Sequence, residues 1–410
     1  MITPVGQQMT PTPPVPPDSA VVERSSEFDA IVERRRVVIC CGTGGVGKTT
    51  TAAVLALEGA RRGRNSVVVT IDPAKRLANA LGLDALSDTA SAIDRARWNP
   101  TGDAEPGGRL SALMLDTKST FDRLVTRNAS DDEQARRILE NTFYRNISGA
   151  LSGTQEYMAM EKLHELHDEG GYDLIVVDTP PSRHALDFLD APQRLIRLLD
   201  NRIFRLLMMP TRAYFRVAGV AVQAFLHTVA RVVGTDVIDD IVAFFRAFEG
   251  MEEGFRARAA AVSDLLADPD TCFVLVTSPR RDAVDEAHFF AEKIGEHGFR
   301  VDALVVNRVH PQFGDESPQG LRARAAELVD EPPAGGWSPE AAAAAQRLSA
   351  LYDNLADFNE VARRERRHLE GLQHRIGTAA AVAYVPLLSH DVHDFDTLDE
   401  VSALVFRRNA

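Results

Sequence analysis

Cysteine, net positive charge and long apolar runs are all scarce in this sequence, and each shortage excludes a class of protein. Only three cysteines occur among the 410 residues: Cys40, Cys41 and Cys272. They form neither a CxxC pair nor a cluster with histidine, so the sequence supports no zinc site and no disulfide framework. Each lies in an apolar stretch, where we expect it to be a small buried side chain.

Acidic residues outnumber basic ones, 59 to 46, and the formal net charge is −13. A general nucleic-acid-binding protein needs a basic surface to neutralise phosphates, so we expect no nucleic-acid partner. No run reaches the roughly 18 to 20 uncharged apolar residues of a membrane-spanning helix. The longest candidate, Val217–Ala230, is bracketed by Arg216 and Arg231. We therefore expect a cytoplasmic protein with at most peripheral membrane contact.

The N-terminal segment is rich in proline between Thr10 and Pro17. It lacks the charged and then apolar regions of a secretion signal. This composition predicts a disordered tail from Met1 to about Arg24, and we place the first domain boundary after Arg34.

Short β-branched runs alternate with segments of helical period, which is typical of an α/β protein with a doubly wound, mostly parallel sheet. The runs are almost continuously apolar, as in strands buried on both faces. Two regions, 119–166 and 191–266, contain no convincing strand and predict an inserted α-helical subdomain. The expected strands are 37–41, 66–71, 110–115, 173–177, 272–277, 303–306 and 381–385.

The second helical region has an unusual composition. Asn201–Thr235 contains no acidic residue, and arginines interrupt a strongly apolar sequence that includes Met208 and Met209. An ordinary pair of core helices with solvated arginines explains this pattern. Two alternatives stay open: an apolar groove that receives a helix or an acyl-like ligand, and reversible membrane contact.

Two features follow in the C-terminal third. Gln312–Trp337 is rich in glycine, proline and acidic residues and predicts a loop. Ser338 and Pro339 then suit the N-cap and first position of a long helix. The basic run Arg363–His368 in that helix is typical of a solvated face, with an acidic partner as the alternative.

The most informative motif follows the first predicted strand and precedes a helix-forming run. It reads Gly42-Thr43-Gly44-Gly45-Val46-Gly47-Lys48-Thr49-Thr50-Thr51 and has the spacing of a phosphate-binding P-loop, or Walker A motif. Glycines let backbone N–H groups point at phosphate oxygens, and the helix N-terminus favours negative charge. Lys48 would bridge the β- and γ-phosphates, and the Thr49 hydroxyl would hold Mg²⁺. We expect ATP and Mg²⁺ as ligands, with nucleotide contacts from Gly44, Gly45, Val46, Gly47, Lys48, Thr49 and Thr50.

Three polar residues at strand ends extend this site. Asp178 ends an apolar run and can reach Mg²⁺ through water, or merely cap the next turn. Asp72 precedes Pro73, which suits a helix N-cap, but its carboxylate can also orient or deprotonate the attacking water. Asn307 ends another predicted strand, where its amide can read an adenine edge or serve as a turn residue. We expect Lys48, Asp72 and Asp178 to be catalytic, and Thr49 and Asp178 to hold the metal.

Five motifs taken together resemble the ArsA-like ATPases, which comprise arsenite-pump ATPases and ATPases that deliver tail-anchored membrane proteins. They are GTGGVGKTTTAA, TIDPAKRL, VVDTPPSRHALDFL, VVNR and VPLLSHDV, in the family's order and spacing. The likeness covers roughly Val37 to Leu404 and is greatest to actinobacterial anion-transporting ATPases, which often come as two paralogous subunits.

The resemblance implies a role for each matching position. Asp72 falls on the switch I aspartate linked to water activation, and Asp178 and His184 fall in switch II. Asn307 falls on the adenine-reading asparagine. The remaining matches are Pro386 and Leu387, on the loop that closes over the base. We therefore divide the chain into a P-loop NTPase core, 35–190 and 267–410, and a helical client or partner subdomain, 191–266. Helices within 119–166 of the core segment also contribute to the helical subdomain.

Three departures from the family pattern change what is expected. Thr43 stands where the family usually has a lysine that reaches the partner subunit's phosphates, and a hydroxyl cannot supply that cation. We hypothesise a heterodimer in which a lysine-bearing paralogue completes the site built on Lys48; a homodimer and substitution by Lys75 are the alternatives. The CxxC zinc clamp of targeting members is absent. The few cysteines also disfavour an arsenite-stimulated subunit, since As(III) prefers thiolates.

The favoured function is an ATP-hydrolysing dimeric switch that binds or delivers a hydrophobic client. The alternatives are a nucleotide-binding regulatory subunit with little turnover, favoured by Thr43, and a partitioning ATPase of the ParA or MinD type, disfavoured by the added helical subdomain. We favour ATP over GTP because Asn307-Arg308-Val309-His310 lacks the aspartate of a guanine-reading sequence.

Overall fold

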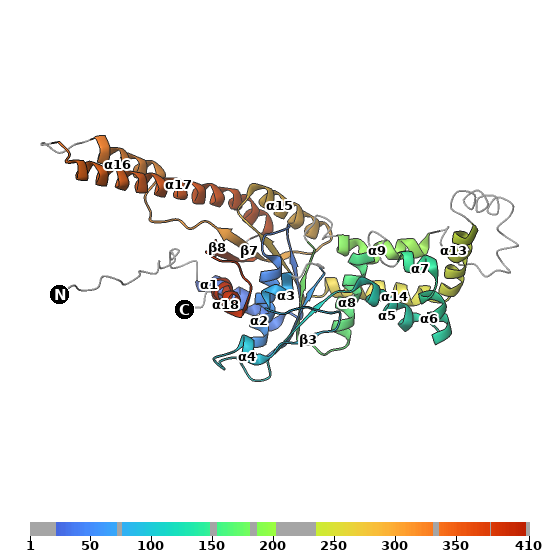
Figure 1. Ribbon diagram of the computed structural model, residues 1–410. Helices are drawn as coiled ribbons and strands as arrows, with labels where there is room; N and C mark the ends of the chain where they lie inside the picture. Colours follow the sequence, from blue (N-terminus) through green and yellow to red (C-terminus); the bar gives the residue numbers. More distant parts are fainter. Residues whose placement is uncertain are drawn as a thin grey trace.

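In the part of the chain that the structure describes, eight strands form one central sheet (Figure 1). The computed structural model describes residues 22–71, 76–147, 154–180, 187–201, 235–330, 336–377 and 379–406. Within them the strand order is β3-β4-β2-β5-β1-β6-β7-β8. Every neighbouring pair is parallel except β3 with β4. The predicted α/β class with a mostly parallel sheet is confirmed.

The predicted strands are all present with small changes at their ends. Among the described strands, β3 was not predicted from the sequence. It has two exposed residues and is too short to show an alternation of apolar and polar side chains. The strands are β1 (Val37–Cys41), β2 (Asn65–Thr70), β3 (Ser91–Ala92), β4 (Arg109–Met114), β5 (Leu174–Asp178), β6 (Thr271–Thr277), β7 (Val301–Val309) and β8 (Ala381–Pro386).

Each face of the sheet has its own apolar core. Successive strand residues point to opposite faces, so Val38 and Cys40 of β1 belong to one core and Ile39 and Cys41 to the other. The first core is closed by α1 (Val22–Arg34), α2 (Lys48–Arg61), α3 (Arg76–Ala80), α4 (Arg95–Trp98) and α18 (Phe395–Phe406). The second is closed by α8 (Thr154–Asp168), α14 (Glu252–Ala267), α15 (Arg281–Glu296) and the end of α17 (Pro339–Ile376). All three cysteines are buried, as predicted.

Helix α1 corrects the predicted extent of the disordered tail. Residues 22–34, placed outside the folded core by their position after the proline-rich segment, form a helix instead. Phe28, Ile31 and Val32 are buried against α2 and α18, and the Phe28 ring meets that of Phe406 edge to face. Three apolar residues spaced over one helical face suffice because a complementary surface already exists.

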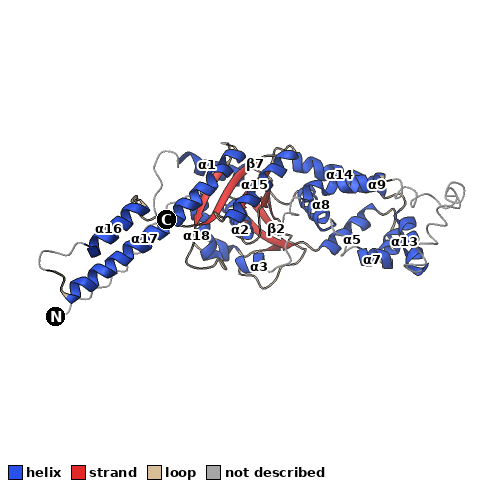
Figure 2. Ribbon diagram, turned by 90° about the horizontal axis from the view of Figure 1, so that it is seen from above, coloured by secondary structure: helices blue, strands red, loops and turns tan. Residues whose placement is uncertain are grey.

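Helix α16 (Pro318–Asp330) corrects the predicted loop over 312–337. Its sequence holds leucine, alanine, arginine and glutamate, which favour helix, and Leu321 and Ala325 are buried on the side facing α17. The predicted start of α17 is confirmed: Ser338 Oγ accepts the N–H of Ala341 at 3.2 Å, with Pro339 at the first position. The two helices form a hairpin that extends away from the sheet (Figures 1 and 2).

A third core lies at the end of the molecule opposite the α16–α17 hairpin (Figure 2). Phe244 is its centre, with the rings of Phe143, Tyr144 and Phe248 within 6.2 Å between centroids. The segment 202–234, on which the predicted apolar groove falls, lies outside the described residues. The contributing helices are α5 (Thr117–Asn128), α6 (Asp132–Leu139), α7 (Thr142–Ile147), α8, α9 (Asp187–Asp200), α13 (Thr235–Phe248) and α14.

No helix in the described part of the chain is both long and apolar enough to cross a membrane. The longest, α17, has 38 residues but carries charged side chains throughout.

A buried glutamate ties α2 to its neighbours. Glu58 is fully buried, and its carboxylate accepts bonds from Arg61 at 3.2 Å, Arg62 at 2.7 Å and the Ser402 hydroxyl of α18 at 2.6 Å. Arg61 and Arg62 also pair with Asp399 and Asp29, but loss of the Glu58 charge takes a fully buried partner from both arginines. Breaking a buried ion pair by removing one member is strongly destabilising.

We predict that Glu58→Gln lowers the free energy of unfolding by about 3 kcal/mol. Urea denaturation followed by circular dichroism measures this. The matched control is Glu133→Gln, whose ion pair with Arg136 is exposed on α6, and little change is expected there because water screens the pair. Equal effects of the two substitutions would contradict a stabilising role for Glu58.

Candidate functional site

The ends of four parallel strands meet at one edge of the sheet and carry most of the predicted site residues. The P-loop follows β1, Asp178 ends β5, Asn307 lies near the end of β7 and Pro386 ends β8. In open parallel sheets, ligands bind at the carboxyl ends of the strands. Segments far apart in the sequence are therefore brought together by strand order.

The P-loop turn needs glycine because the backbone is left-handed and closely packed. Gly47 has φ 101°, and a Cβ there would lie 2.2 Å from Asn307 Nδ2. Gly47 is also the N-cap of α2 and, as a glycine, forms no side-chain cap hydrogen bond with that helix. The first residues of α2, Lys48, Thr49 and Thr50, line the cavity described below, which is the position of an anion-binding helix N-terminus.

Asp178 is the buried acidic centre of the site, only 1% exposed. Its Oδ2 accepts hydrogen bonds from the Thr49 hydroxyl at 2.8 Å and the Thr70 hydroxyl of β2 at 3.0 Å. A buried carboxylate requires such partners. One carboxylate and two hydroxyls provide hard oxygen donors, and these suit Mg²⁺, which usually takes one or two protein carboxylates plus phosphate oxygens and water. The predicted pair Thr49 and Asp178 is thus brought together.

Lys48 is the buried cation of the P-loop, with 5% of its surface exposed. Its Nζ donates to the Thr43 carbonyl oxygen at 2.8 Å, which holds the ammonium beside the first half of the loop. Burial raises the pKa of the nearby Cys41 thiol to about 12, so this side chain is a neutral thiol at physiological pH.

Asn307 connects β7 to the P-loop. Its Nδ2 donates to the Val46 carbonyl oxygen at 2.8 Å, and its Oδ1 accepts the N–H of Arg308 at 2.9 Å. Both ends of the amide therefore hold protein backbone. Its predicted contact with adenine stays a prediction.

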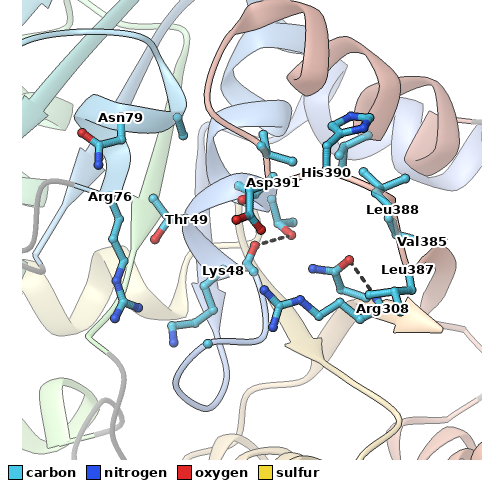
Figure 3. A pocket seen from close by; sticks show the side chains of 18 of the residues that line it. Lys48, Thr49, Arg76, Asn79, Arg308, Val385, Leu387, Leu388, His390 and Asp391 are labelled. Carbon is cyan, nitrogen blue, oxygen red and sulfur yellow. Dashed lines mark hydrogen bonds between the residues drawn. The ribbon is translucent and has the colours of Figure 1, made fainter. Parts of the chain in front are cut away.

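A cavity of about 730 Å³ opens over these residues (Figure 3), a size typical of ligand pockets. Gly44 and Val46 instead line a smaller adjoining cavity of about 240 Å³, together with Thr43. Asp178 lies beneath Thr49, while Asp72, Lys75 and His184 lie outside the described residues. The predicted residues that line the larger cavity are Gly45, Gly47, Lys48, Thr49, Thr50, Asn307, Pro386 and Leu387.

Several residues of the cavity were not predicted as site residues. Arg76 lies in the same motif as Asp72, and Arg308 directly follows Asn307, so both could have been predicted from their positions in the sequence. Asn79 on α3 has no such signal. His390 and Asp391 follow the predicted Pro386 and Leu387 in the loop after β8, and His390 pairs with Glu400 at 3.0 Å.

The charges around the cavity favour a polyphosphate. Lys48, Arg76 and Arg308 line it, and Asp391 is the one carboxylate among the described lining residues. Cations together with backbone donors of a helix N-terminus recognise phosphate groups.

Residues 35–328, from β1 through most of α16, match the sequence model of the anion-transporting ATPase family. The chain belongs to this family. The match covers the P-loop, Asp178 and Asn307.

Three individual relatives show what else the chain is similar to. An uncharacterized protein of Streptomyces coelicolor is 30% identical over 274 residues, 66% of this chain and 62% of the relative. The ATPase get3 of Aspergillus terreus is 24% identical over 281 residues, 68% of this chain and 74% of the relative. The ATPase GET3 of Malassezia globosa is 24% identical over 278 residues, 68% of this chain and 74% of the relative. The predicted resemblance to ArsA-like ATPases is confirmed.

We predict that Gly47→Ala weakens nucleotide binding about tenfold to a hundredfold, the worth of one or two hydrogen bonds to charged groups. The new Cβ must displace Asn307 and break its bond to Val46. Calorimetric titration with Mg²⁺ and ATP measures the effect. The control is Gly170→Ala, which has a similarly left-handed φ of 64° but open space around it. Equal affinities in the two variants would contradict the prediction.

Proposed function

We propose that this member of the family is a Mg²⁺-dependent ATPase that works as a dimeric switch for a hydrophobic client, as one subunit of a heterodimer. The observation that carries the proposal is the Thr49–Asp178–Thr70 cluster beneath a cation-lined cavity at the N-terminus of α2. This arrangement can bind a magnesium-bound triphosphate and sense its last phosphate.

The chain's own residues have separate tasks in ATP hydrolysis. Backbone N–H groups of the P-loop and α2 bind the phosphates, and Lys48 neutralises charge between the second and third. Thr49 and Asp178 would hold Mg²⁺, which when bound neutralises charge on the phosphates. Asp72 is proposed to orient the attacking water, on sequence grounds alone. We propose ATP rather than GTP because the sequence has no guanine-reading motif.

The switch is proposed to act through β5. Asp178 ends this strand, which is preceded in the chain by α8 and followed by α9. Met158 of α8 and Leu199 of α9 both belong to the third core. A shift of Asp178 when the nucleotide changes would therefore act on two helices of the subdomain that we propose to bind the client. The apolar, arginine-containing sequence 201–235 supports a hydrophobic client.

Thr43 supports a heterodimer with a paralogous ATPase. It lines the cavity of about 240 Å³ beside the P-loop, where a threonine offers a hydroxyl but no positive charge. In the proposed dimer a paralogue with lysine at this position completes the site built on Lys48. The same residue favours the second candidate function, a nucleotide-binding regulatory subunit with little turnover.

We predict that Lys48→Ala reduces affinity for ATP about a hundredfold or more, because a buried charge-assisted contact to phosphate is lost. The control, Lys293→Ala, removes an exposed lysine of α15 that pairs with Glu296. Calorimetry with Mg²⁺ present measures both. Unchanged binding in the Lys48 variant would exclude the proposed nucleotide site.

We also predict slow hydrolysis by this chain alone and acceleration of about a hundredfold by the paralogue, since one transition-state cation contributes on this order. Phosphate release by each protein alone and by the mixture measures it. Thr43→Lys is expected to raise turnover of the isolated chain. Rapid turnover by the unmodified chain without a partner would sink the asymmetric arrangement, and no turnover in either setting would favour the regulatory subunit.

A further inference from the structure

Arg308 has a backbone conformation that arginine rarely adopts. Its φ of 62° makes it the one non-glycine residue with positive φ in the described part of the chain. Such a conformation is unfavourable for a residue with a Cβ and persists where the surroundings enforce it, often at a ligand site. The register of β7 against β8 also shifts here, between Val306 and Val309.

The irregularity turns two consecutive side chains toward one place. In a regular strand neighbouring side chains point to opposite faces, yet Asn307 and Arg308 both line the cavity of about 730 Å³. Bulges redirect side chains in this way beside active sites. Asn307 holds the arrangement, since its amide bonds both the Arg308 N–H and the Val46 carbonyl.

Arg308 is shared by the two cavities at the P-loop. Arg308 lines the larger cavity with Lys48 and also the smaller one with Thr43 and Gly44. The Lys48 ammonium, which neutralises the last two phosphates in the proposed function, is bonded to the Thr43 carbonyl oxygen. Figure 3 shows the Arg308 side chain extending from beside Leu387 toward the P-loop.

No carboxylate among the described residues forms an ion pair with Arg308. The acidic groups of the smaller cavity have other partners: Asp282 pairs with Arg280 at 2.8 Å, and Glu365 binds the His310 ring at 2.6 Å. Arg308 is exposed, has an unfavourable backbone conformation and lines a cavity that Lys48 and Arg76 also line, so its guanidinium is suited to a ligand anion.

We propose that Arg308 binds the terminal phosphate of ATP and so makes this chain distinguish ATP from ADP without a residue from the partner. The inference rests on the proposed function and adds to it a residue in the same subunit. It also gives the chain with Thr43 a second cation beside Lys48 for recognising the triphosphate.

The decisive variant is Arg308→Gly, because glycine adopts the left-handed backbone freely while removing the guanidinium. We expect its affinity for a non-hydrolysable ATP analogue to fall about tenfold to a hundredfold, with affinity for ADP changed less than about threefold. Arg308→Ala should behave alike, and Arg308→Lys should recover part of the loss. Calorimetry on the full-length chain with Mg²⁺ measures all three. The control is Arg322→Ala, which removes the partner of Asp357 on α17.

Each other result overturns the inference. Equal losses for the analogue and ADP would place Arg308 on the base, the ribose or the first two phosphates. Loss in Arg308→Ala but not in Arg308→Gly would make the backbone conformation, not the guanidinium, the contribution. If the wild-type chain binds neither nucleotide, the proposed function itself fails; if it binds both and Arg308→Gly matches it, only this inference fails.

Discussion

The buried carboxylate of Asp178 is the interaction on which the site depends. Two hydroxyls hold it, one from the first turn of α2 and one from β2, so three separate segments must be in place before the charge is satisfied. A carboxylate removed from water is unfavourable without such partners. The same oxygens suit a divalent cation. The atoms that satisfy the hydrogen bonds of the buried carboxylate are therefore also the atoms that would bind the ligand.

Parallel strand order brings these segments together. β5, β1, β6, β7 and β8 are adjacent and run in one direction, so the loops that follow them open on the same edge. The P-loop, Asn307 and the loop after β8 then surround one cavity, and β5 delivers Asp178 beneath it. The helices packed on both faces bury the strands and fix this register.

Errors in the sequence-based fold prediction share a cause. Helix α1 has only a few apolar residues, and its order depends on the surface that α2 and α18 offer. Helix α16 lies in a segment with glycine and proline, and the short apolar face that it buries packs on α17. The pair β3–β4 is limited to two residues. In each case contact with another element stabilises a segment whose local apolar pattern is short, and in α16 a helix-favouring composition adds to it.

The sequence by itself determined the P-loop, the class of sheet and most of its strands, because a phosphate cradle is built from consecutive residues and buried strands are uninterrupted apolar runs. Only the tertiary structure decided that Thr70 joins Thr49 on Asp178, that Asn307 holds the Val46 carbonyl, and that Arg308 turns toward the cavity. Those facts depend on strand neighbours and on one irregular residue pair in β7. The contact of Thr70 with Asp178 joins segments more than a hundred residues apart, and the orientation of Arg308 comes from a local departure from strand geometry. Neither feature produces a periodic pattern in the sequence.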